Sequence, residues 1–153
     1  MSPELDTAIF VVGVGIPMLL AYGYGNAFFS GWRSLSTRYR ERSAFALAAG
    51  LRGQIARFGG KWAASEYPHS VTIAVDGLGL HLGQRGILRI GHPPILIPWS
   101  SIDAVGPVKW FIRTFDTYRV DGRYTVGFPS DSAGALLIAP YVERRSVEVR
   151  NDH

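Results

Sequence analysis

Residues 9–29, with the sequence IFVVGVGIPMLLAYGYGNAFF, contain no charged side chain. An α-helix rises about 1.5 Å per residue, so roughly 20 apolar residues cross the hydrocarbon core of a bilayer. Backbone groups inside lipid need hydrogen-bond partners within the segment, so this stretch is predicted to be helical. Pro17 lacks a backbone N–H and predicts a kink. We therefore expect a transmembrane helix over residues 7–30, preceded by a short outer tail, residues 1–6.

A cleaved signal peptide is the alternative for an apolar stretch near an N-terminus. Signal peptides begin with a positively charged segment and have a shorter apolar stretch. Here the first seven residues, MSPELDT, include Glu4 and Asp6 and no basic residue. Length and flanking charge therefore favour a membrane anchor.

The charges beyond the apolar run predict its orientation. All 16 Lys and Arg residues follow it, and positive charge is retained on the cytoplasmic side of a membrane. The first four basic residues are opposed only by Glu41; they are Arg33, Arg38, Arg40 and Arg42. We expect the N-terminus outside and the rest of the chain in the cytoplasm, at a bacterial inner membrane.

Small and aromatic residues mark two surfaces on the predicted helix. Small residues four positions apart let a second helix approach closely, although glycine is also common in membrane helices for other reasons. The predicted helix-docking residues are Ala21, Gly23, Gly25 and Ala27. Aromatic and basic residues gather at membrane interfaces. The predicted interface residues are Tyr22, Tyr24, Trp32, Arg33, Arg38, Tyr39, Arg40 and Arg42.

The 153-residue chain carries a net charge of +4 and has no cysteine. It therefore cannot form disulfides, use a thiol nucleophile or build a cysteine-based metal site. The positive excess is concentrated beside the apolar run, where it is suited to anionic lipid headgroups. Nucleic-acid binding would favour basic residues gathered with aromatics on a folded face. We therefore expect no nucleic-acid partner.

The rest of the chain predicts a small mainly-β domain. A basic juxtamembrane helix or linker, residues 31–51, leads into residues 52–145, and a polar tail follows, residues 146–153. Short runs rich in β-branched residues predict six or seven strands. The segments with a strand-like pattern, from which these strands are expected to form, are residues 53–58, 70–76, 80–82, 86–90, 95–98, 102–105, 108–115, 117–120 and 124–128.

Turn residues separate these segments, and a helix follows them. Residues 62–67 are expected to be a connection that ends at Pro68, and residues 106–107 a turn. Ser130 or Asp131 is expected to cap the helix, and Pro140 to kink or stop it near Ala139. Short antiparallel strands with one closing helix favour a small pleckstrin-homology-like barrel or sandwich.

Residues 91–102, GHPPILIPWSSI, resemble a motif of small, largely uncharacterised bacterial membrane proteins. Their G-W-x-x-L-x-x-x-Y-R stretch is matched from Gly31 to Arg40, and their D-x-x-G-L-x-L hairpin from Asp76 to Leu82. The step from Ile97 to Ile102 resembles the strand entry of bacterial pleckstrin-homology-like and GRAM-like domains. The resemblance implies a membrane helix followed by a cytoplasmic β domain. That group has no established catalytic residues to carry over.

We expect no catalytic residue, cofactor or metal. The four histidines, at positions 69, 81, 92 and 153, lack the spacing of a helical metal pair. The ring of His92 is expected to bond a backbone carbonyl in a turn. Residues 83–91 are glycine-rich and could hold a phosphate or simply form a solvated hairpin. The candidate interface or anion-binding residues of this region are Arg85, Arg89, His92 and Trp99.

Two functions remain open. The first is a non-catalytic accessory or scaffolding subunit that docks on integral membrane protein subunits through its helix and β domain, with respiratory or photosynthetic complexes as natural hosts. The second is a sensor of anionic lipid headgroups at the inner membrane surface. An enzyme is not expected, because the sequence offers no convergent nucleophile and base.

Overall fold

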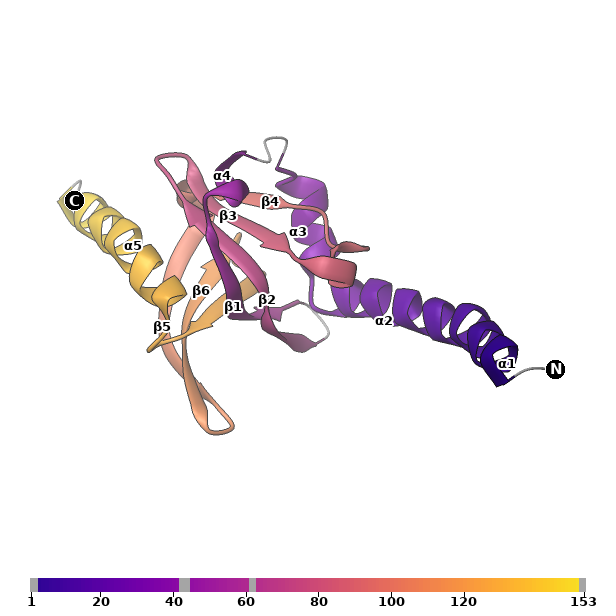
Figure 1. Ribbon diagram of the computed structural model, residues 1–153. Coiled ribbons are helices and arrows are strands. Elements are labelled where there is room, and N and C mark those ends of the chain that lie inside the picture. Colours follow the sequence, from indigo (N-terminus) through magenta and orange to yellow (C-terminus); the bar gives the residue numbers. More distant parts are fainter. Residues whose placement is uncertain (1–2, 42–44, 61–62, 152–153) are drawn as a thin grey trace.

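The computed structural model describes residues 3–41, 45–60 and 63–151. Figure 1 shows a long helical rod that leaves one side of a curled β-sheet, while a second long helix extends from the other side. The rod comprises α1 (Pro3–Phe10), a π-helical turn (Val11–Gly15) and α2 (Ile16–Phe29). Its segment Val11–Phe29 is long and apolar enough to cross a membrane, two criteria that a signal sequence near the N-terminus also meets.

The irregular turn of the rod lies directly before Pro17. Ile16 donates its backbone N–H to the carbonyl of Val11, five residues earlier instead of the usual four. Pro17 has no N–H to offer the carbonyl of Gly13, so one α-helical bond is lost here. The distortion that proline predicts is thus located one turn earlier, as a π-helical turn.

The rod ends in a tight turn at Gly31. This residue has a φ of +82°, a left-handed conformation that favours glycine and commonly terminates helices. A Cβ at this position would lie 2.8 Å from Cδ1 of Tyr124 and 3.1 Å from the Cα of Gly60. The rod therefore meets the β-sheet directly, and helix α3 (Trp32–Arg38) begins at the next residue.

Seven antiparallel strands form one sheet, in the order β4-β3-β2-β1-β7-β6-β5, and Figure 1 shows that the sheet curls on itself. The predicted mainly-β domain of six or seven strands and a C-terminal helix is confirmed at this level. The strands are β1 (Leu51–Gly59), β2 (Ala64–Val75), β3 (Gly79–Gln84), β4 (Ile95–Pro98), β5 (Ile102–Trp110), β6 (Arg113–Val120) and β7 (Tyr124–Pro129). The remaining helices are α4 (Phe45–Ala48), two 3₁₀ turns (Gly86–Arg89 and Trp99–Ser101) and α5 (Ala133–Asn151).

The segment after α3 adds to one edge of this sheet. Arg40 forms an antiparallel bridge with Ile95 of β4. Leu96 donates its N–H to the carbonyl of Tyr39 at 2.8 Å, and Glu41 donates to the carbonyl of Pro94 at 3.0 Å. These bonds occupy part of the outer edge of β4, so the juxtamembrane segment belongs to the folded domain.

The predicted turn at residues 106–107 is wrong. β5 continues through Gly106 and Pro107 with a register shift opposite β6, and the chain reverses only after Trp110. A bulge absorbs the irregular residues, and Pro107 is tolerated because β5 is an edge strand that needs no further ladder bond.

Two other predictions around β2 and β3 are also wrong. β2 begins at Ala64 and runs through Pro68, because a positive φ of 48° at His69 and a register shift in β1 absorb the proline. A 3₁₀ turn, Gly86–Arg89, stands where a strand was predicted over residues 86–90. Gly86, with a φ of +63°, turns the chain out of the sheet there.

The C-terminal helix is longer than predicted. Its first turn is capped by Ser132, whose hydroxyl oxygen accepts the N–H of Ala135 at 3.2 Å, in place of Ser130 or Asp131. The helix then passes through Pro140 to Asn151, so residues 146–151 are not a separate tail. Pro140 has no N–H to donate to the carbonyl of Leu136. Leu136 is 70% exposed, so water can supply the missing donor.

Trp32 lies at the centre of the domain core and is fully buried. Its ring centroid is 4.6 Å from that of Phe58, 5.7 Å from that of Tyr67 and 5.3 Å from that of His92. Its indole N–H donates to the carbonyl of Pro93 at 2.9 Å. The expectation that Trp32 lies at the membrane interface is therefore wrong, because its ring packs into the sheet beneath the end of the rod.

A buried polar chain runs beside this tryptophan. The hydroxyl of Ser30 is 2.8 Å from that of Tyr67, which in turn is 2.9 Å from Nε2 of His92. Nδ1 of His92 is 3.2 Å from the carbonyl of Ile90, as predicted for this ring. A carbonyl only accepts, so Nδ1 donates to it and Nε2 can accept from Tyr67. Burial raises the pKa of Tyr67 to about 12, although the bond with Ser30 partly opposes the shift.

This pKa predicts a loss of stability at alkaline pH. The neutral phenol is favoured in the fold, so the stabilisation is complete below 10.0, the ordinary pKa of a tyrosine, and is lost as pH rises to about 12. At about 1.4 kcal/mol per pKa unit, the loss is about 2–3 kcal/mol. Tyr67→Phe should remove this alkaline loss, while costing about 1–2 kcal/mol at neutral pH because two partners lose a bond.

The measurement is denaturant unfolding of the full chain in detergent between pH 8 and pH 12. Tyr118→Phe is the comparison variant: burial also raises the pKa of Tyr118 to about 12, so it should remove a similar alkaline loss. It should cost less at neutral pH than Tyr67→Phe, because its hydroxyl is outside the Ser30–Tyr67–His92 chain. Equal alkaline losses in the wild type and Tyr67→Phe would contradict the prediction.

Candidate functional site

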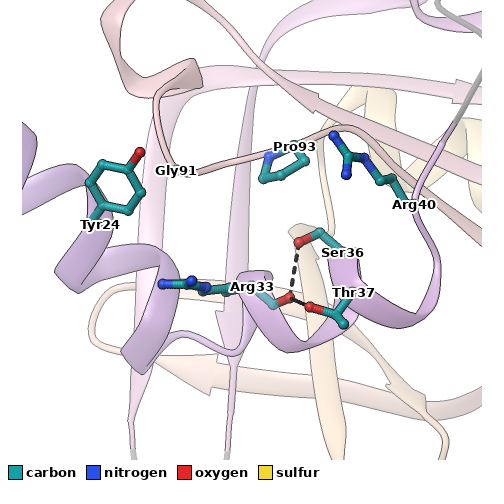
Figure 2. Close-up of a pocket in the computed structure, with 7 residues that line it drawn as sticks. All are labelled: Tyr24, Arg33, Ser36, Thr37, Arg40, Gly91 and Pro93. Carbon is teal, nitrogen blue, oxygen red and sulfur yellow. Dashed lines mark hydrogen bonds between the residues drawn. The ribbon is translucent and has the colours of Figure 1, made fainter.

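A pocket of about 380 Å³ lies where α2, α3 and the segment before β4 meet. Figure 2 shows Arg33 and Arg40 on either side of two hydroxyl side chains, with Tyr24 at one end. The lining residues are Tyr24, Arg33, Ser36, Thr37, Arg40, Gly91 and Pro93. We call this feature the juxtamembrane pocket.

The pocket exists because α3 has two unlike faces. Trp32 and Leu35 are buried in the core, which turns Arg33 and Thr37, one helical turn apart, toward the outside. The hydroxyls of Ser36 and Thr37 both donate to the carbonyl of Arg33 at 2.9 Å. Their hydrogens are therefore used, and the two guanidinium groups are the main donors left for a ligand.

Neither arginine of the pocket has an acidic partner within the part of the chain that the structure describes. Both are exposed. The neighbouring Arg38 differs, because its Nε is 3.2 Å from a carboxylate oxygen of Asp121. A pocket with two cations and no counter-ion attracts an anion, and planar guanidinium groups are well suited to phosphate oxygens.

The pocket is beside the apolar rod, at the level of its tyrosines. Gly91 has a φ of +80°, and a Cβ there would be 3.1 Å from Cδ1 of Tyr24. A Cβ on Gly23 would likewise be 3.3 Å from the carbonyl oxygen of Ile90. Tyr22 and Tyr24 are 62% and 49% exposed, as interfacial aromatics are expected to be.

The small residues predicted to dock another helix divide into two groups. Gly23 and Ala27 are buried against the protein's own domain, so their assignment to a partner helix is wrong. A Cβ on Gly23 would press on the segment before β4, and Ala27 belongs to the buried core. Ala21 is exposed, and a Cβ on Gly25 would meet nothing within 4 Å. Docking through this second pair stays a prediction.

The other predicted interface residues lie in different parts of the structure, some on the surface and some against or within the domain. The hydroxyl of Tyr39 is half-buried and donates to the carboxylate of Asp121 at 2.7 Å, so it faces the domain. Arg85 and Arg89 are exposed, whereas His92 is buried in the core. Arg42 lies outside the described residues.

Trp99 is not part of the region that holds Arg85 and Arg89. Its ring stacks on Tyr141 of α5 at 4.8 Å between centroids and 11° between planes. Its indole N–H donates to the carbonyl of Asp76 at 2.8 Å. The four residues grouped in the sequence prediction therefore do not form one site.

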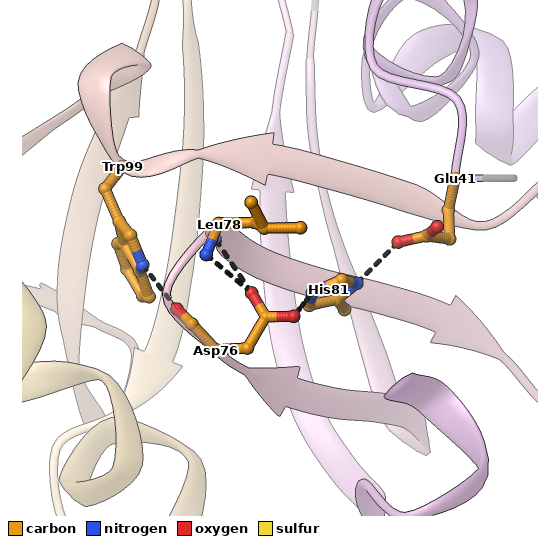
Figure 3. A network of polar contacts seen from close by, with 6 residues as sticks. Glu41, Asp76, Leu78, His81 and Trp99 are labelled. Carbon is orange, nitrogen blue, oxygen red and sulfur yellow. Dashed lines mark hydrogen bonds and ion pairs between the residues drawn. The ribbon is translucent and has the colours of Figure 1, made fainter. Parts of the chain in front are cut away.

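A buried histidine network was not predicted (Figure 3). His81 is 3% exposed; its Nδ1 is 2.5 Å from Oε2 of Glu41 and its Nε2 is 2.9 Å from Oδ2 of Asp76. The imidazole of His81 therefore lies between two carboxylates. It connects the juxtamembrane segment to β3. The three residues carry no local motif, because Glu41 is 40 positions from His81.

The Asp76 carboxylate also closes the turn between β2 and β3. Its Oδ1 accepts the N–H groups of Leu78 at 2.8 Å and Gly79 at 3.1 Å. Partial burial opposes ionisation, but these two bonds and the contact with His81 together lower the pKa of Asp76. Within the described residues, no group of three or more histidine and acidic side chains is placed to hold a metal ion. We therefore interpret the network as a structural connection.

No protein-family model, curated protein or solved structure matches this chain. Function must therefore be inferred from the pocket and its surroundings.

The histidine network predicts strong coupling between Glu41 and His81. Glu41→Gln or His81→Gln alone removes one member of a buried pair, which costs about 3–5 kcal/mol. The double variant should cost less than the sum of the two, by about 1–3 kcal/mol. Denaturant unfolding of the four proteins measures this difference.

Glu66→Gln with Arg113→Gln is the control cycle. That pair is 3.5 Å apart and largely exposed, so its coupling should be below about 1 kcal/mol. Additive costs for Glu41→Gln and His81→Gln would contradict the proposed bridge.

Proposed function

We propose that this protein is a membrane-anchored, non-catalytic binding module that recognises the phosphate of anionic lipid headgroups in its juxtamembrane pocket. The observation that carries the proposal is the pair of guanidinium groups, Arg33 and Arg40, that line a pocket beside the apolar rod without an acidic partner among the described residues. A lipid phosphate has the charge and geometry that such a pair prefers.

The proposal includes a location. The rod crosses the bacterial inner membrane, the N-terminus faces outward and the β domain lies in the cytoplasm. The supporting features are the length of the apolar segment and the basic residues that follow it, which are typical of the cytoplasmic side. The exposed tyrosines at positions 22 and 24 would then mark the boundary of the bilayer and put the pocket within its headgroup layer.

We also propose that the β domain is pleckstrin-homology-like. Its support is the strand order, in which a meander is closed by pairing of β1 with β7 and opens between β4 and β5. A C-terminal helix that contacts β1 and β7 is consistent with the same architecture. The proposal concerns the fold and adds no activity to the chain.

The lipid function predicts a selectivity that depends on the two pocket arginines. Each cation near an anionic bilayer contributes about 1 kcal/mol, which corresponds to about fivefold in affinity. Arg33→Gln and Arg40→Gln should each weaken the preference for phosphatidylglycerol over phosphatidylcholine about fivefold, and the double variant more than tenfold. Native mass spectrometry of the full chain with each lipid measures the preference.

The matched control is Arg119→Gln with Arg123→Gln. It removes the same charge from exposed residues of β6 and the following turn and should leave the preference unchanged. An unchanged preference in the Arg33→Gln/Arg40→Gln variant would refute the lipid function, as would equal losses in the two double variants.

A second candidate function is an accessory subunit of a membrane protein complex. It is favoured by the contrast between the two small-residue pairs: Gly23 and Ala27 contact the protein's own domain, whereas Ala21 and Gly25 are open. The open pair would let a partner helix approach the rod closely.

The accessory function predicts a stoichiometric complex that depends on Gly25. Gly25→Leu should abolish copurification of integral membrane proteins after gentle detergent extraction, because the larger side chain blocks close helix approach. Gly13→Leu is the control, since a Cβ there also meets nothing within 4 Å. A protein that purifies alone from its native membrane would refute this function.

A further inference from the structure

The hairpin between β5 and β6 projects from the domain (Figure 1), and three consecutive apolar residues, Trp110, Phe111 and Ile112, form its end. Trp110 pairs with Arg113 across the hairpin, so Phe111 and Ile112 form its two-residue turn. Phe111 is 82% exposed and Ile112 is 94% exposed. Side chains of this size are seldom so exposed together at a tip unless they contact something.

The turn residues are also unusual for a hairpin. Phe111 has a φ of +52°, a conformation that glycine and asparagine adopt readily and aromatic residues seldom do. Glycine at position 111 would adopt this φ without strain. The presence of Phe111 is therefore unfavourable for the hairpin itself and points to a role for its exposed side chain.

Basic residues surround the tip. Lys109 and Arg113 are on its two strands, and the guanidinium of Arg57 stacks over the Trp110 ring at 3.8 Å. Residues 104–115 include no acidic residue. Glu66, on β2, pairs with Arg113 at 3.5 Å. Aromatic and aliphatic side chains flanked by cations are the composition that enters the interface of an anionic bilayer.

Contacts along β1 connect Trp110, at the base of this tip, with the end of the rod. Gly60, which follows β1, packs on the exit turn, where its Cβ would be 2.9 Å from the N of Gly31. Arg57, whose guanidinium stacks on Trp110, lies three residues before Gly60, so roughly 10 Å of strand separates it from the exit turn of the rod. Transmembrane helices tilt by about 20° on average, and a tilt toward the hairpin would move its tip toward the membrane.

We propose that the tip formed by Trp110, Phe111 and Ile112 inserts into the interface of the same bilayer that the rod crosses. This inference rests on the proposed location of the rod in the membrane. The bilayer is the favoured occupant because the anchor keeps it permanently within reach and because the charge around the tip complements anionic lipid. Rod and tip together fix the tilt of the domain and aim the juxtamembrane pocket at the headgroups.

The absence of native cysteine permits a direct test. Ile112→Cys in the full chain is labelled with an environment-sensitive fluorophore and reconstituted into phosphatidylglycerol nanodiscs whose acyl chains carry a quencher. Leu136→Cys on α5 is the matched control, because Leu136 is also a large aliphatic residue on the surface, 70% exposed. Far-UV circular dichroism confirms that both variants fold.

Insertion predicts blue-shifted emission and at least twofold quenching at position 112, with neither effect at position 136. Water-like emission without quenching at position 112 overturns the proposal and leaves the tip to solvent or a protein partner. Phe111→Cys, labelled in the same way, provides a second reading at the tip and should give the same result.

The outcome is separable from that of the pocket. The Arg33→Gln/Arg40→Gln variant should lose its lipid preference while the label at position 112 stays quenched. If the label at position 112 is quenched but the Arg33→Gln/Arg40→Gln variant keeps its lipid preference, the pocket function is refuted and insertion of the tip is supported. An unquenched tip in a protein that still selects anionic lipid would refute the tip alone.

Discussion

The packing of Trp32 beneath the end of the rod determines where the other parts of the molecule lie. The ring is in contact with β1 and β2, and its N–H is bonded to the carbonyl of Pro93. Only the exit turn at Gly31 separates the rod from this buried residue. Because the connection is short and packed, the domain cannot swivel freely about the rod. The orientation of the rod in a membrane would therefore set the orientation of the sheet.

The positive character of the juxtamembrane pocket follows from the same arrangement. Burying Trp32 directs Arg33 outward, and the acidic side chains nearby have other contacts. Glu41 is held by His81, and Asp121 by Arg38 and Tyr39. These contacts stabilise the juxtamembrane segment against the sheet and also withdraw the carboxylates that could neutralise the pocket. The same polar contacts thus hold the juxtamembrane segment on the sheet and leave the pocket positively charged.

Hydropathy and alternation predicted the apolar helix, the mainly-β domain and most strand positions, because these patterns reflect burial that repeats along the chain. They failed where long-range contacts decide. Trp32 has the composition of an interfacial residue, and only the sheet beneath it explains its burial. The turn at Phe111 lacks the usual turn residues, while Gly106 and Pro107 mark a bulge. The contact between Glu41 and His81 joins residues with no local pattern.

The two small-residue pairs of the rod show how one motif can have two meanings. Gly23 lies against the segment before β4, and Ala27 is buried in the core of the domain. The same contact brings the domain alongside the helix, up to the level of Tyr24, so part of the rod is covered on one side by protein. At the level of the domain, a partner helix could approach closely on the side of Ala21 and Gly25. The juxtamembrane pocket lies on the covered side, so a ligand of the pocket and a partner helix would occupy different faces of the rod and need not compete.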